Sequence, residues 1–193
     1  MNGPCRIVFL LPGAGRIPVG GFKVKTAQKT GATVIQGGFP DTGLPSAHFD
    51  IVTLSHVIEH VCDPLAALRE AFRVLKPGGH PWLATPNMGS FGHARFGADW
   101  RGLEPPRHLV LFNNNSLEKA LGGAGFIDIE RKPCLAQAAW FYQSSLRISR
   151  CQDPYNANAN GLPQTLRFAA RIADFKAAAA PSRCETIVMT AQC

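Results

Sequence analysis

The stretch Phe49-Asp-Ile-Val-Thr-Leu-Ser55 decides the fold class of this chain of 193 residues. Its β-branched and aromatic side chains are typical of a buried strand. A second run of this kind, Ala32-Thr-Val-Ile-Gln36, precedes it, and the connection between the two is rich in glycine and proline. Because that connection leaves no room for a long helix, we expect two buried parallel strands joined by a loop that lies near one end of the sheet.

A helix is predicted directly after the second of these strands. Asp63 has the character of an N-cap and Pro64 that of a first helical residue. Apolar residues then recur at spacings of three and four, as one helix face requires: Leu65, Leu68, Phe72 and Leu75. The helix is expected to end at Lys76-Pro77-Gly78-Gly79, where glycine tolerates a left-handed turn. A short strand, Trp82–Thr85, should follow.

The rest of the chain continues to alternate between the two kinds of element. We expect, in order, an irregular stretch from Pro86 to about Phe112, a helix from Asn115 or Ser116 to Ala124, a strand over Phe126–Glu130, helices over Leu135–Arg150 and Leu162–Ala178, and a last strand over Thr186–Thr190. This pattern predicts an α/β sheet covered by helices, with a helical insertion at about 135–180 before the last strand.

Composition excludes several classes of protein. A hydrophobic fraction of 46% is that of a folded globule. No apolar run approaches the about 18 residues that span a bilayer, so we predict a cytoplasmic protein without integral membrane contact. The net charge of +7 comes from basic residues interspersed with acids, and no nucleic-acid partner is expected. The six cysteines contain no CxxC pair and are expected to be free thiols.

Several motifs stand in the order known from one enzyme family. The run Phe49–Val61, Asp63-Pro64 and Leu75–Gly79 resembles the middle of class I S-adenosylmethionine-dependent methyltransferases. Pro105–Leu109 with Phe112, and then Ala124-Gly-Phe126, resemble a subgroup that includes ubiquinone-biosynthesis and glycan-modifying members. The resemblance covers about Lys23–Cys193 and implies an incomplete Rossmann-like, doubly wound sheet. It also implies S-adenosylmethionine as cofactor and methyl transfer to a small quinone-like or glycan-like acceptor.

The same resemblance assigns roles to individual residues. Four are expected to bind the cofactor: Gly38 and Phe39 near its adenine, and Ser55 and His56 near its methionine part. His60 and His108 are the candidate catalytic bases, because imidazole titrates near neutral pH. Trp100, Arg101 and Arg107 are the expected acceptor-binding residues, and no metal is predicted.

The amino-terminal segment departs from the family. Leu11-Pro-Gly-Ala-Gly15 offers only a short glycine motif without a preceding acid, and Arg16–Gly31 holds no Asp or Glu for a ribose. We therefore divide the chain into an atypical segment, residues 1–22, and a methyltransferase-like domain, residues 23–193, that is truncated at its amino terminus. The alternative to an active enzyme is an inactive, methyltransferase-like remnant or partner subunit, which would act as a homodimer or with a complementing subunit.

Three further hypotheses remain open. His56-Val-Ile-Glu59-His60 spells HxxEH, the motif of inverted zinc peptidases, which requires both histidines on one helix. His56, Glu59 and His60 could instead hold a divalent ion. Separately, the late helices could form an interfacial lid for a lipid-linked acceptor, through Trp140, Phe141, Tyr142, Arg147 and Arg150.

Overall fold

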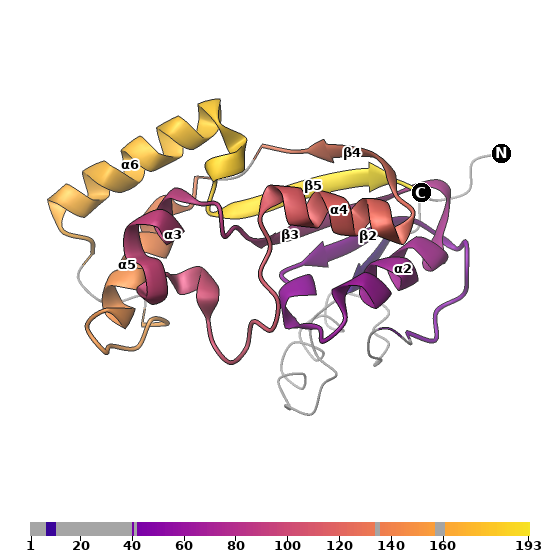
Figure 1. The fold of residues 1–193 in the computed structure, drawn as a ribbon, viewed down its shortest axis with the longest axis horizontal. Helices are drawn as coiled ribbons and strands as arrows, with labels where there is room; N and C mark the ends of the chain where they lie inside the picture. Colours follow the sequence, from indigo (N-terminus) through magenta and orange to yellow (C-terminus); the bar gives the residue numbers. More distant parts are fainter. Residues whose placement is uncertain (1–6, 11–39, 41, 134–135, 157–160) are drawn as a thin grey trace.

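The computed structural model describes residues 7–10, 40, 42–133, 136–156 and 161–193 (Figure 1). Within these residues one sheet has the strand order β1-β2-β3-β5-β4. The strands are β1 (Ile7–Leu10), β2 (Phe49–Ser55), β3 (Leu75–Pro86), β4 (Ile127–Arg131) and β5 (Thr186–Gln192). The first three are parallel, and β5 runs antiparallel to both β3 and β4. The predicted Rossmann-like α/β sheet is confirmed.

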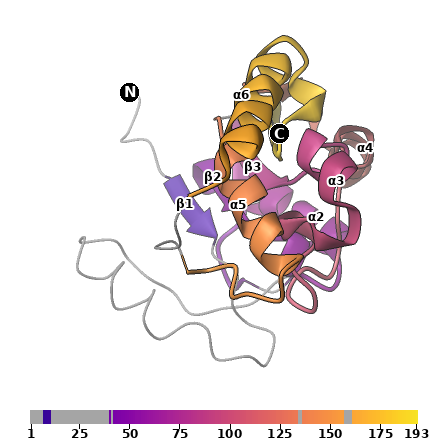
Figure 2. The same cartoon turned by 90° about the vertical axis from the view of Figure 1, so that its left-hand side faces the viewer.

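Helices cover this sheet in two groups. The α-helices are α2 (Pro64–Val74), α3 (Phe91–Phe96), α4 (Asn114–Ala124), α5 (Ala138–Ile148) and α6 (Gln164–Ala179). Short 3-10 helices are η1 (Ile58–His60), η2 (Gly97–Asp99), η3 (Arg101–Leu103) and η4 (Pro181–Arg183). Helices α2 and α4 lie side by side along the sheet, whereas α3, α5 and α6 gather at one end of it (Figures 1 and 2).

Each group of helices has its own apolar core. The first joins the sheet to α2 and α4, and its fully buried members include Val52, Leu54, Leu68, Leu83, Leu117 and Met189. The second lies among α3, α5 and α6 and contains Trp100, Phe141, Tyr142, Leu162 and Ala170. Helices α5 and α6 both fall between β4 and β5, which confirms the helical insertion before the last strand.

Helix α2 begins where its sequence predicts. The Asp63 carboxylate accepts a hydrogen bond from the backbone N–H of Ala66 at 2.9 Å, and Pro64 is the first helical residue. A proline is tolerated there because the first N–H groups of a helix have no partner within it. Val74 is the last helical residue, so the helix ends before the predicted stop at Lys76–Gly79, and Leu75, expected on its apolar face, is the first residue of β3.

The strand after α2 is longer than expected. It starts at Leu75, directly after the helix, whereas we predicted only Trp82–Thr85. Gly78 does adopt a left-handed φ of 78°, but its N–H donates to the carbonyl of Cys193 at 2.9 Å. The predicted turn is therefore an irregularity of β3, held by the far end of the chain, and such a long-range contact leaves no local sequence signal.

Two further elements differ from the sequence prediction. The N-cap of α4 is Asn113, earlier than the predicted Asn115 or Ser116, because the Asn113 side chain accepts from the N–H of Ser116 at 2.9 Å. Helix α3 was predicted as irregular chain. Its N-cap is Ser90, whose hydroxyl accepts from the N–H of His93 at 3.0 Å. A helix of six residues is too short to show a helical period.

Some expectations fall outside the described residues. These are the strand Ala32–Gln36, the glycine motif Leu11–Gly15 and the cofactor residues Gly38 and Phe39. Within the amino-terminal segment, Ile7–Leu10 pairs in parallel with β2, an element that we did not predict. The division at residue 22 stays a prediction.

Cysteine chemistry corrects one expectation. Cys62, Cys151 and Cys193 are free, as predicted, but Cys184 is disulfide-bonded. Sequence spacing detects metal and redox motifs, and it gives no signal for a bridge between distant cysteines. Among the described helices, none is both long and apolar enough to cross a bilayer.

Candidate active site

The site begins at the carboxyl end of β2. Ser55, the last residue of the strand, is exposed. His56 follows with a left-handed φ of 51°, and its N–H donates to the carbonyl of Ala84 on β3 at 2.8 Å. In open α/β sheets, ligands bind beyond the carboxyl ends of the strands. The predicted cofactor residues Ser55 and His56 therefore lie at the edge where a ligand is expected, and their role stays a prediction.

Glu59 connects several segments at this edge of the sheet, and its side chain is completely buried. One carboxylate oxygen lies 3.0 Å from Nδ1 of His56. The other accepts from the Thr85 hydroxyl on β3 at 3.0 Å. Its backbone carbonyl also accepts from the N–H of Leu109 at 2.7 Å. Glu59 thus connects the end of β2, the end of β3 and the loop that carries His108.

The two predicted bases, His60 and His108, lie against each other. Their ring centroids are 4.8 Å apart in an edge-to-face arrangement. Nδ1 of His60 lies 2.9 Å from the carbonyl of Arg107, and Nδ1 of His108 lies 2.7 Å from the carbonyl of Gly102. A carbonyl can only accept, so each Nδ1 carries a proton, and Nε2 is the nitrogen of each ring that can take up a further proton.

The protonation of His108 depends on burial and on nearby charge. Its side chain is only 5% exposed, and this burial lowers the pKa of the imidazole. The hydrogen bond to Gly102 and the carboxylates of Glu59 and Glu104 oppose the shift, whereas His60 adds to it. Because the pKa falls below its ordinary value, His108 is neutral at pH 7.

Glu104 holds the loop in front of the histidines. Its carboxylate binds the Arg101 guanidinium at 2.6 Å, the Arg107 guanidinium at 2.5 Å and the Tyr155 hydroxyl. Burial raises the pKa of Glu104, but the hydrogen bonds from Arg101 and Tyr155 and the two positive charges outweigh it, so the pKa is lowered. The predicted acceptor residues Arg101 and Arg107 are therefore both paired within the protein, and the exposed Arg107 is the better placed for a ligand.

Trp100 connects the loop to the second core. It is 1% exposed, its Nε1–H donates to Glu185 at 2.9 Å, and its ring stacks on Phe141. Arg101 is also buried, with its N–H donating to the Ser145 hydroxyl at 2.9 Å. Their contact with an acceptor stays a prediction. In the structure, both residues anchor the loop to α5.

A cation could be held by part of this cluster. Glu59, His60 and His108 each offer one ligand atom, and these atoms lie within 4.8 Å of one another. His56 is not in that group, so the ligand set differs from the His56, Glu59 and His60 set of the sequence hypothesis. The zinc-peptidase geometry does not fit either, because η1 begins at Ile58 and leaves His56 on the preceding turn.

Three residues of the site have roles in the structure that were not predicted from the sequence. Glu59 appeared only in the metal hypotheses, and Thr85 and Glu104 were not singled out. The position of Glu59 between the two histidines of the HxxEH motif was a usable sequence signal for it. Thr85 and Glu104 had no such signal, because their partners are distant in sequence and become neighbours only in the folded sheet and loop.

Parallel strands, a layer of helices and a polar cluster at the carboxyl edge define a Rossmann-like α/β protein with a ligand site at that edge. The family described as a methyltransferase domain matches residues 12–130. This is more than half of the chain, and the chain belongs to that family.

Two named relatives illustrate the range of the family. The chain is 34% identical over 98 residues to a "Probable S-adenosylmethionine-dependent methyltransferase" of Mycobacterium tuberculosis, covering 50% of this chain and 33% of the relative. It is 38% identical over 130 residues to a ubiquinone biosynthesis O-methyltransferase of Cereibacter sphaeroides, covering 63% of this chain and 53% of the relative. The chain thus spans between a third and about half of the length of these relatives.

Solved structures support the fold. A SAM-dependent methyltransferase of Thermotoga maritima aligns with a TM-score of 0.55 at 17% identity, covering 88% of this chain and 68% of that one. A chain from the Haloferax volcanii complex of the Trm112 methyltransferase activator with a methyltransferase aligns with a TM-score of 0.56 at 15% identity, covering 88% and 66%. At these identities the likeness concerns the fold alone.

Proposed function

We propose that this domain transfers a methyl group from S-adenosylmethionine to an oxygen, or a similar atom, of a small quinone-like or glycan-like acceptor. The family supports the reaction class, and both named relatives are methyltransferases. The observation that carries the proposal is the pair of His60 and His108, each with Nδ1 held by a carbonyl. This leaves basic nitrogens close to the carboxyl edge of the sheet.

The carboxyl edge fits the proposed cofactor in the part that the structure describes. Ser55 is exposed, and the His56 side chain is 45% exposed, so both can reach a ligand beyond β2. The bond between His56 and the buried Glu59 fixes the ring at this edge. When bound, S-adenosylmethionine would supply an electrophilic methyl group.

The chain's own contribution is to hold the acceptor and to take its proton. His60 is the more accessible of the two histidines, and its Nε2 would accept the proton of the acceptor hydroxyl. The neutral His108 beside it adds no positive charge that would oppose this transfer. Arg107, at the exposed side of the loop, would attract an anionic or electron-rich acceptor.

The proposal is tested by calorimetric titration with S-adenosylhomocysteine, which needs the cofactor pocket but no turnover. We expect micromolar binding that falls by about tenfold in His56→Ala, the loss of one good hydrogen bond. The matched control is His80→Ala, because His80 lies in β3 away from its carboxyl end and bonds to Ala191. In a methyl-transfer assay with a catechol acceptor, His60→Gln should lower the rate by about a hundredfold or more and leave S-adenosylhomocysteine binding unchanged.

Two results would contradict this function. If a folded chain, verified by circular dichroism, does not bind S-adenosylhomocysteine at millimolar concentration, the domain is no autonomous enzyme, and the inactive partner subunit becomes the better explanation. If the chain binds but His60→Gln methylates at the normal rate, the catalytic assignment of His60 is wrong.

A further inference from the structure

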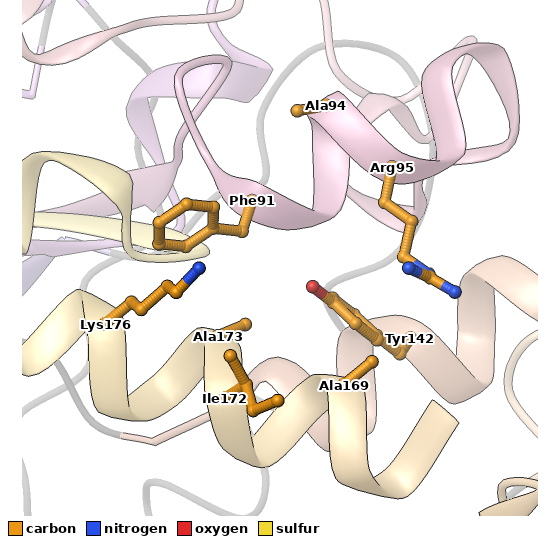
Figure 3. Close-up of a pocket in the computed structure, with 8 residues that line it drawn as sticks. All are labelled: Phe91, Ala94, Arg95, Tyr142, Ala169, Ile172, Ala173 and Lys176. Atoms are coloured by element: carbon orange, nitrogen blue, oxygen red, sulfur yellow. The ribbon is translucent and has the colours of Figure 1, made fainter. Parts of the chain in front are cut away.

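A cavity that opens widely to solvent lies away from the histidine cluster, among the helices of the second core. It has a volume of about 380 Å³ and is bounded by α3, α5 and α6 (Figure 3). Its lining consists of Phe91, Ala94, Arg95, Tyr142, Ala169, Ile172, Ala173 and Lys176. Cavities of this size accommodate small organic molecules. None of these residues belongs to the proposed methyl-transfer site.

Part of the lining of this cavity is apolar. Phe91 from α3 faces Ile172 and the small side chains of Ala169 and Ala173 from α6 (Figure 3). The small alanine side chains leave an open space, and the Phe91 ring and the Ile172 side chain lie on either side of it. A flat apolar body, such as an aromatic ring system, therefore has complementary surfaces on both sides.

The charged groups around the cavity all have one sign. Lys176 extends toward Phe91 on one side, and the Arg95 guanidinium lies beside Tyr142 on the other (Figure 3). Both cations are exposed, and the Arg183 guanidinium lies over the Phe91 ring, 4.8 Å from the ring centre. No acidic residue is among the described residues of the lining. An anionic ligand complements this charge distribution.

A buried hydroxyl points into the cavity. Tyr142 is 3% exposed, and its hydroxyl is directed between Phe91 and α6 (Figure 3). Within the described part of the chain, the structure shows no hydrogen bond made by this hydroxyl. Burial, followed by the charge of Glu185, raises the pKa of Tyr142 to about 12, so the hydroxyl remains a donor at all physiological pH values.

The nearby carboxylates are engaged elsewhere. Glu185 accepts hydrogen bonds from the N–H of Gly92 and from Trp100, and Asp174 accepts from the N–H of Ala138 at 3.1 Å. Burial also raises the pKa of Glu185. These acids therefore do not fill the place of an anion in front of Tyr142.

We infer that this cavity is a binding site for a small aromatic carboxylate. The carboxylate lies between Lys176 and Arg95 and accepts a hydrogen bond from the Tyr142 hydroxyl. The ring system packs between Phe91 and Ile172. This assignment does not depend on the methyl-transfer proposal, since the two sites share no residue.

The test is calorimetric titration of the full chain with 2-naphthoate and with 2-naphthalenemethanol, which has the same rings without a charge. We expect naphthoate to bind at least about tenfold more tightly, from its charge-assisted hydrogen bonds. Lys176→Gln and Arg95→Gln should each weaken naphthoate by about fivefold to tenfold and leave the alcohol unchanged. Tyr142→Phe should weaken naphthoate by a smaller factor.

Arg171→Gln is the matched control, because Arg171 is exposed on α6 and carries the same charge but does not line the cavity. It should leave naphthoate binding as in the unmodified chain. Equal affinity for acid and alcohol would overturn the inference. So would an equal loss in Arg171→Gln and Lys176→Gln, which would mean general attraction by the net charge. Each variant is compared with the unmodified chain by thermal unfolding, and if Arg95→Gln or Lys176→Gln misfolds, the other of the two decides the case.

Discussion

At the scale of single residues, the protonation of His108 is the most consequential feature of the site. The ring is held by Gly102 and faces Glu104 at 3.5 Å, yet burial lowers its pKa. A lowered pKa means that the native state prefers the neutral ring. The stability that this preference contributes is complete above the pKa of an unfolded histidine, about 6.5, and is lost as the pH falls through the lower native value.

We expect an NMR titration of the His108 ring protons to give a midpoint below about 6.5. Assignment by comparison with the spectrum of His108→Gln separates this ring from the other five histidines. A midpoint at or above the ordinary value would show that Glu59 and Glu104 outweigh burial. His108 would then carry a positive charge near neutral pH and could not be the neutral neighbour of His60.

Residue-scale prediction from the sequence succeeded where neighbours in the chain are also neighbours in space. His56, Glu59 and His60 are close together because a tight turn at the end of β2 brings them there. His60 and His108, 48 positions apart by their numbers, were each nominated because imidazole titrates near neutral pH, and nothing in the sequence showed that their rings touch. The pairing of Arg101 and Arg107 with Glu104 was equally invisible, because the loop has no regular period.

At the scale of elements, three consecutive asparagines begin α4 and have three different environments. Asn113 is the N-cap, Asn114 is buried and donates to the carbonyl of Ser182 at 2.9 Å, and Asn115 is exposed. The sequence predicted a cap in this region but placed it at Asn115 or Ser116. Propensity favours asparagine at any such position, and only the backbone of the preceding chain selects one.

Asn113→Ala should therefore lower the free energy of unfolding by about 1 kcal/mol, the usual cost of losing a cap. Asn115→Ala, the same change two positions later, should cost much less or slightly stabilise the helix, since alanine has the higher helix propensity. Urea denaturation of both variants measures the difference. An Asn115→Ala variant less stable than Asn113→Ala would place the cap where the sequence first suggested.

The strongest elements were the most predictable. Helix α2 has a cap, a proline at the first position and a clear apolar period, and all three agree. Strand β3 was underestimated because its first residues form an irregular edge bonded to Cys193, and α3 was missed because it is short and rich in glycine neighbours. For β3 the determining contact is long-range, and local sequence patterns do not record it.

At the scale of the whole molecule, two apolar cores are joined through a small polar junction. Glu185, just before β5, accepts from the N–H of Gly92 at 2.7 Å and from Trp100 at 2.9 Å. Gly92 belongs to α3, and Trp100 packs in the second core. This junction holds the helical layer at the end of the sheet.

Gly92→Ala should disrupt the junction. A Cβ at this position would lie 2.2 Å from Oε2 of Glu185, which is buried and cannot move without losing its bond to Trp100. We expect a loss of about 2 kcal/mol in the free energy of unfolding, as for other overpacked cores. Guanidinium denaturation provides the measurement.

Gly122→Ala is the control for this change. Gly122 is an exposed residue of α4 with no atom within 4 Å of a built Cβ, so alanine should stabilise the helix by up to about 1 kcal/mol. If Gly92→Ala were as well tolerated as Gly122→Ala, the contact with Glu185 would not hold the two cores together.

The separation of the two cores has a consequence for how such a domain changes during evolution. Substitutions at Phe91, Ile172 or Lys176 alter the cavity of the helical layer without touching the packing of β2, β3 and α2. Selection removes mutations that destabilise the sheet. Selection on the lining of the cavity acts mainly through the ligand that the cavity binds. Lineages that share this sheet can therefore diverge in ligand preference while the junction around Glu185 stays the same.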